Sequence, residues 1–154
     1  ATMGEIDAAV GLAQLSRIDD ILLRRKHVEA WYQTEMQSFE GIKPPYLAED
    51  VDEVHWMLYK IHLGKRFTAS ARNQLIEDMD SNNVETAAYC QPLHQQFHYQ
   101  QRGWKRGSLP NTERIGDRSL VLPFHCHLDE DEVRFIVQTL KDASVNVGAG
   151  AAIY

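Results

Sequence analysis

The chain has 154 residues, a length that suits one domain with a real core and is short for two. Hydrophobic residues make up 44% and charged residues 25%, a balance that excludes disordered and fibrous proteins. The net charge of -6 argues against nucleic acid and anionic membranes as partners, and no apolar run approaches the ~20 residues of a membrane span. Its two cysteines, Cys90 and Cys126, form neither a CxxC motif nor a disulfide framework, so we expect a reducing cytoplasm.

Residues 4–39 carry apolar side chains at helical spacing and predict a long amphipathic helix, bent near Ser16. The first turns are apolar almost all round and rich in small residues, so we expect them to pack against a partner. A helix that is already under way at residue 4 suggests the C-terminal part of a longer protein. We expect the isolated chain to form a homodimer through one face of this helix, which carries Ile6, Ala9, Val10 and Ala13.

The remaining elements are predicted from periodicity and turn residues. In chain order they are a break at 43–45, a strand over 54–63, a helix capped by Thr68 or Ser70, a strand over 84–90, a long polar and aromatic loop over 91–110, a short helix from Asn111 or Thr112, a short strand over 120–123 and a last helix capped by Asp129.

Helices that alternate with short strands predict an α/β fold with a small sheet and helices mainly on one face, led by the long N-terminal helix (1–39). A loop as long as 91–110 is usually functional in a compact domain. Residues 143–154 show no clear period after the last helix, so we place the domain at 1–142 and expect a flexible tail beyond it.

Three motifs occur in a fixed order along the chain: MGEIDAAVGLAQL at 3–15, PLHQQ with Tyr99 at 92–99, and LPxxE at 109–113 followed by LVLP at 120–123 and LDEDEV at 128–133. The sequence HWMLY at 55–59 adds an aromatic strand. Together these segments resemble the C-terminal half of the DegT/DnrJ/EryC1/StrS sugar aminotransferases, in particular the perosamine-synthase-like members.

This resemblance implies the small C-terminal domain of a fold-type I enzyme that uses pyridoxal phosphate. Such an enzyme moves an amino group from glutamate to a nucleotide-linked keto-sugar, in making a polysaccharide or secondary metabolite. It also implies a missing N-terminal large domain that holds the Schiff-base lysine and most contacts to the cofactor. None of the six lysines stands in that context, so we expect this chain alone to be inactive and to bind no cofactor: Lys26, Lys43, Lys60, Lys65, Lys105 and Lys141.

The resemblance also implies which residues bind substrate. His94 would lie on a loop facing the cofactor and the sugar-nucleotide pocket, where an imidazole can hydrogen-bond substrate. The plain alternative is a solvent-facing histidine. Gln96 and Tyr99 share the motif and would bind substrate or support the loop. Trp56 and Tyr59 are interpreted as core residues. The particular sugar and nucleotide stay open.

Two other classes of function stay open. The first is a non-catalytic binding module that reuses the fold. The second is a zinc module, although its spacings match no standard one; its candidate ligands are Cys90, His94, His98, His125, Cys126 and His127.

Three smaller patterns have simpler explanations. Trp104-Lys105-Arg106 with Arg102 is a basic and aromatic cluster that suits a nucleotide diphosphate or a solvated loop. The acidic run 129–132 suits a helix start better than a cation site. Gly103 and Gly107 lack the GxxxxGK[ST] pattern of a phosphate loop.

Overall fold

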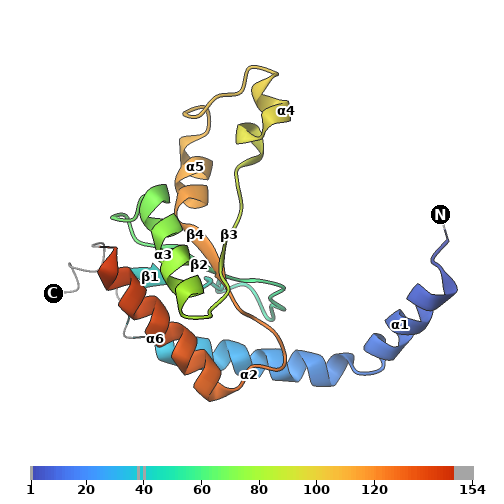
Figure 1. Ribbon diagram of the computed structural model, residues 1–154. Coiled ribbons are helices and arrows are strands. Elements are labelled where there is room, and N and C mark those ends of the chain that lie inside the picture. The colour runs from blue at the N-terminus through green and yellow to red at the C-terminus, as the bar shows by residue number, and fades with distance from the viewer. Residues whose placement is uncertain (1, 38, 40, 148–154) are drawn as a thin grey trace.

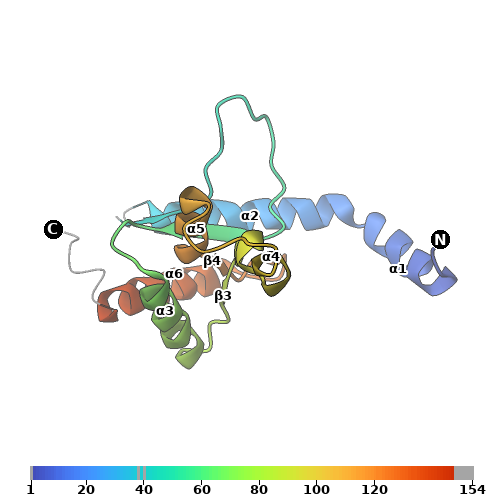
Figure 2. The same ribbon diagram turned by 90° about the horizontal axis from the view of Figure 1, so that it is seen from above.

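The computed structural model describes residues 2–37, 39 and 41–147, with helices packed mainly on one face of a small antiparallel sheet (Figures 1 and 2). Within the described residues, no helix combines the length and the apolar character needed to cross a membrane. In chain order the elements are α1 (Glu5–Leu15), α2 (Ile18–Met36), β1 (Ile42–Lys43), β2 (Tyr59–Leu63), α3 (Ala69–Ser81), β3 (Ala87–Ala88), η1 (Leu93–Gln95), α4 (Phe97–Gln100), α5 (Pro110–Asp117), β4 (Ser119–Leu122) and α6 (Glu130–Asn146).

The sheet has the order β1-β2-β4-β3, and every neighbouring pair is antiparallel. Tyr59 lies opposite Leu122, and Ala87 lies opposite Val121. Side chains along β2 alternate between buried and half-buried, as expected when one face of a sheet meets the core. The half-buried positions, Lys60 and His62, therefore belong to the opposite face.

The core lies between the buried face of the sheet and the helices α2, α3 and α6. Tyr32 of α2 stacks on Tyr59 of β2 with the ring centroids 4.6 Å apart, and its hydroxyl donates to the Pro123 carbonyl at 2.7 Å. Burial raises the pKa of both tyrosines. Leu75 and Met79 of α3 complete the contact with α6. The expected α/β class and the interpretation of Tyr59 as a core residue are therefore correct.

The expected long helix is two helices, separated at Ser16 and Arg17. The Ser16 hydroxyl donates to the Ala13 carbonyl at 2.9 Å, and the Arg17 amide donates to Gln14 three residues back. These tighter bonds replace the regular helical ladder and explain the bend that the sequence predicts. None of the residues of α1 is buried by the rest of the described chain, and α1 extends away from it (Figure 1).

The strand expected over 54–63 covers only Tyr59–Leu63, and the residues before it follow α2 instead. Trp56 is half-buried and donates its indole N–H to the Glu29 carboxylate at 2.7 Å, while Arg25 donates to the Met57 carbonyl at 3.2 Å. These contacts hold the base of the long connection between β1 and β2 that projects in Figure 2. The short strand β1 was not predicted, because Lys43 precedes two prolines that interrupt regular structure.

Two helix starts follow the sequence prediction closely. Thr68, one of two candidate caps, accepts a hydrogen bond from the Ala71 amide at 3.1 Å. Asp129 and Glu132 form a reciprocal capping box at the start of α6, with bonds of 2.8 and 3.0 Å. The acidic run 129–132 is therefore a helix start.

The last helix is longer than expected and the second predicted strand is shorter. α6 continues to Asn146, and Ala143 and Ser144 are buried, so the flexible tail placed from residue 143 does not begin there. Residues 148–154 of that expected tail lie outside the described residues. The strand predicted over 84–90 reduces to β3, because only Ala87 and Ala88 pair with β4.

Candidate functional site

The motif-bearing loop forms a projecting segment, residues 89–117, which we call the arm. It contains η1, α4 and α5 and stands away from α2 and α6 (Figure 1). Two short helical turns interrupt the loop expected over 91–110. The first residue of α5 is Pro110, where proline costs nothing because the first helical amides have no intrahelical partner. The arm returns to the sheet through β4.

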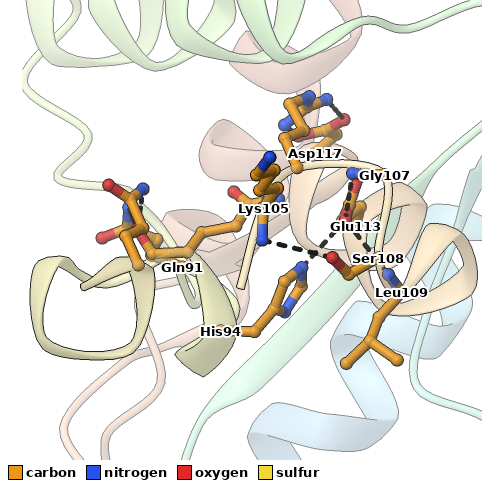
Figure 3. A network of polar contacts seen from close by, with 11 residues as sticks. Gln91, His94, Lys105, Gly107, Ser108, Leu109, Glu113 and Asp117 are labelled. Carbon is orange, nitrogen blue, oxygen red and sulfur yellow. Dashed lines mark hydrogen bonds and ion pairs between the residues drawn. The ribbon is translucent and has the colours of Figure 1, made fainter. Parts of the chain in front are cut away.

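Glu113, in the first turn of α5, is the centre of the polar contacts in the arm (Figure 3). Its carboxylate is buried and accepts the Gly107 amide at 2.7 and 2.9 Å and the Leu109 amide at 3.3 Å. The Nε2 atom of His94, itself buried, lies 2.8 Å from the same carboxylate. One side chain thus joins three positions of the arm that are separated in sequence.

The protonation of this pair follows from its geometry. The hydrogen bond from His94 lowers the pKa of Glu113 below its ordinary value of 4.5. Burial opposes this shift, and the amides of Gly107 and Leu109 reinforce it. Because an ionised carboxylate can only accept hydrogen bonds, Nε2 of His94 carries the proton that joins them.

A hollow of about 510 Å³ lies between the arm and the face of the sheet that carries Lys60. Its wall is mainly apolar, with the aromatic rings of Tyr99 and Trp104 and few polar groups, which is typical of small-molecule sites. The rings of His94 and Trp104 meet edge to face, with their centroids 6.4 Å apart. The lining residues used below are Lys60, His94, Tyr99, Trp104, Ile115 and Gly116.

The structure places the three predicted substrate residues differently from one another. His94 and Tyr99 line the hollow, but the Nε2 side of His94 faces Glu113. Gln96 is exposed and outside the lining, and its carbonyl accepts the amides of Tyr99 and Gln100 at 2.9 and 3.0 Å. His94 is therefore not the solvent-facing histidine of the plain alternative. A substrate role for His94, Gln96 and Tyr99 stays a prediction.

Glu113 was not predicted as a site residue, although a signal for it exists. It is the glutamate of the LPxxE motif at 109–113, and it stands in a first helical turn, where a carboxylate suits the unpaired amides. Lys60 was missed as well. Its position in a predicted strand does not indicate which loop will pack over that strand and form a hollow with it.

The zinc alternative finds no support in the described part of the chain. No group of three or more His, Cys, Asp or Glu side chains there is placed to hold a metal ion. Cys90 and His94 belong to the arm, whereas His125 lines a different hollow beside α6. The rings of His125 and His127 neighbour each other with centroids 6.3 Å apart.

Arg106 of the basic cluster and the two glycines have structural roles in the arm. Arg106 pairs with Asp117 at 2.5 Å, which raises the pKa of Arg106 and joins the loop to the end of α5. Gly103 and Gly107 have φ values of 91° and 95°, in the left-handed region that favours glycine. These glycines therefore make turns.

A second, larger hollow of about 720 Å³ lies between β3, β4 and the start of α6. None of the three predicted substrate residues lines it, and its rim is acidic, with Glu85, Asp129, Asp131 and Glu132. An acidic rim disfavours a phosphorylated ligand, so we take the hollow in the arm as the candidate site.

The match to known proteins covers nearly the whole chain. Residues 1–141 match the model of the DegT/DnrJ/EryC1/StrS aminotransferase family. The chain belongs to this family. Proteins similar to it include the spore coat polysaccharide biosynthesis protein SpsC of Bacillus subtilis, 30% identical over 142 residues. Another is the GDP-perosamine synthase of Caulobacter vibrioides, 31% identical over 144 residues.

Solved structures of similar proteins agree in fold. Spr1654 from Streptococcus pneumoniae, solved in a PLP form, matches with a TM-score of 0.85 and 26% identity over 95% of this chain. DesV of S. venezuelae matches with a TM-score of 0.78 and 26% identity over 91% of it. The chain spans 36–38% of the length of these four proteins. The chain has the α/β fold of the matching part of fold-type I aminotransferases, as expected.

Proposed function

We propose that this chain is the C-terminal portion of a cytoplasmic aminotransferase that moves an amino group from glutamate to a nucleotide-linked keto-sugar. The observation that carries the proposal is the hollow in the arm, because the PLHQQ motif and Trp104 build it together. A chain that spans about a third of its relatives contributes one wall of a larger site.

The chemistry of this wall supports a sugar nucleotide. Flat aromatic rings such as Tyr99 and Trp104 suit stacking against a nucleobase or the apolar face of a sugar ring. The ammonium group of Lys60, half-buried at the same hollow, suits a diphosphate. In this proposal Tyr99, Trp104 and Lys60 bind and orient the substrate. The ring of His94 packs against the ring of Trp104 and supports it.

Pyridoxal phosphate, which the family uses, requires a lysine, an acidic partner for its ring nitrogen and a phosphate cradle. The hollow offers Lys60, but no Asp or Glu is among the described residues that line it. The chain's own residues therefore do not fit the cofactor. We propose that a large domain outside this sequence holds it and supplies the electron sink for the amino-group transfer.

Turnover by the complete gene product tests this function. With glutamate as donor and GDP- or dTDP-linked 4-keto-sugars as acceptors, we expect 2-oxoglutarate to form. Trp104→Ala should raise KM for the sugar nucleotide by about tenfold, because it removes a stacking surface. Trp56→Phe, at a residue that does not line the hollow, is the control and should leave KM unchanged. Binding of the sugar nucleotide without turnover would instead favour the non-catalytic module.

We also propose that α1 packs against the large domain or a second copy in the complete homodimer, and that the isolated chain dimerises through it. Ile6, Val10, Leu12 and Leu15 are each more than half exposed, and burying such residues releases about 25 cal/mol per Å². Sedimentation of the isolated chain should show a dimer, which Ile6→Asp with Val10→Asp converts to a monomer. Ala8→Asp with Gly11→Asp, on the opposite face of α1, is the matched control. A monomer before substitution would contradict this assembly.

A further inference from the structure

We propose that Glu113 is the positioning residue that holds the arm in its substrate-binding shape. Glu113 does not itself line the hollow, so it acts through the groups that it binds. This inference rests on the proposed function, because it assigns to Glu113 the shape of the wall that would meet the sugar nucleotide.

The arm has little apolar burial to hold it in place. All ten residues of the stretch 101–110, which includes Trp104, are exposed, whereas a core helix such as α6 buries a full apolar face. The position of this stretch therefore depends on polar contacts and on the backbone conformation of its turns. Glu113 anchors its end through Gly107 and Leu109.

The same carboxylate reaches back 19 residues to His94. With Nε2–H donated to Glu113, the imidazole is held in one orientation, and its ring supports the edge of Trp104. Glu113 thus ties the start of the arm, the turn at Gly107 and the aromatic wall into one unit. Loss of the carboxylate would release its contacts with His94, Gly107 and Leu109 together.

Only a carboxylate satisfies this set of partners, because every group that faces Glu113 is a donor. A glutamine at this position would turn an NH₂ group toward one of the donors, so one contact would become repulsive. An aspartate would stay an acceptor but is one methylene shorter, so it cannot span Gly107 and His94 together. These differences make the two substitutions distinguishable.

The test compares Glu113→Gln with Asp117→Asn in the complete gene product. Asp117 binds the same stretch through Arg106, but at the surface and without contact to His94. For Glu113→Gln we expect faster amide exchange over 106–110, KM for the sugar nucleotide raised about tenfold, and kcat at saturating substrate within about twofold. For Asp117→Asn we expect KM and kcat close to wild type.

Three outcomes would decide against the inference. If Glu113→Gln loosens 106–110 but leaves KM unchanged, or lowers kcat alone, Glu113 does not position the binding wall. If Glu113→Gln fails to fold, Glu113→Asp replaces it, and an unchanged KM with exchange accelerated at 106–110 overturns the proposal in the same way.

The proposed function fails separately. Wild-type protein that neither binds GDP or dTDP nor turns over their keto-sugars overturns the proposed function and removes the binding role of Glu113 with it. Binding of these probes by wild type, weakened about tenfold in Glu113→Gln, supports both.

Discussion

The helical core and the arm are held together by different forces. α6 alone buries seven side chains against the sheet, α2 and α3, among them Val133 and Leu140. The arm is largely exposed and depends on the contacts of one buried carboxylate, Glu113. The core therefore resists changes of pH that the arm should feel. The following experiments can break or sharpen this contrast.

The largest effect is expected in the core. Leu140→Ala should lower the free energy of unfolding by about 2–5 kcal/mol, because Leu140 is fully buried and its removal leaves a cavity. Leu93→Ala in the arm, where the side chain is 65% exposed, should change it by less than about 0.5 kcal/mol. Urea unfolding followed by circular dichroism measures both. Equal losses for the two leucines would contradict the contrast.

The packing of Gly116 in α5 against the start of the arm comes next. A Cβ at Gly116 would lie 2.9 Å from two ring carbons of Pro92 and 3.3 Å from the Cys90 carbonyl oxygen. Gly116→Ala should therefore cost about 1–3 kcal/mol by overpacking. The control is Gly11→Ala in α1, where a Cβ meets no atom of the described residues within 4 Å and should favour the helix by about 0.5–1 kcal/mol. A harmless Gly116→Ala would show that the arm shifts freely.

A smaller effect is expected at the start of α6. Asp129→Ala removes the side chain that accepts the Glu132 amide and should cost about 1 kcal/mol. Asp129→Asn keeps an acceptor, so its free energy of unfolding should stay within a few tenths of a kcal/mol of the wild-type value. Thermal unfolding of both variants checks this. A loss as large as that of Leu140→Ala would mean that polar contacts also dominate the core.

The smallest effect on overall stability, and the most local, is the response of the arm to acid. The pKa of Glu113 is lowered in the folded chain, so its stabilising contribution is complete above about pH 4.5 and is lost as the pH falls below that value. The titratable His94 and the charged Arg106 face it. We expect the indole N–H signal of Trp104 to shift below pH 4.5 before the core unfolds.

Glu113→Gln removes this titration and serves as its control, so the Trp104 signal of that variant should stay constant over the same range. Asp117→Asn should keep the wild-type transition. An identical shift in the Glu113→Gln variant would show that the titration of another group causes the change in the Trp104 signal.

The sequence alone predicts those elements whose signals act over a few residues. α6 is predicted by the cap at Asp129 and by the helical spacing of its apolar residues Val133, Ile136, Val137 and Leu140. The cap at Thr68 predicts the start of α3 in the same way. The bend at Ser16 follows from a local side chain that bonds back to the helix. The order of the motifs is equally local, and it was enough to identify the family.

Tertiary contacts decided the rest. β1 and β3 are strands only because β2 and β4 lie beside them. Residues 54–58 are outside the sheet, and Trp56 among them bonds to Glu29 of α2. The hydrogen bond between His94 and Glu113 spans 19 residues, and Lys60 of β2 lines the hollow from the sheet. Sheet pairing and loop closure bring together groups that are far apart in sequence. A local sequence pattern does not encode the entropic cost of bringing such groups together. The sequence therefore determined which residues carry the motif, and the tertiary structure decided which of them face the hollow and which one holds the others in place.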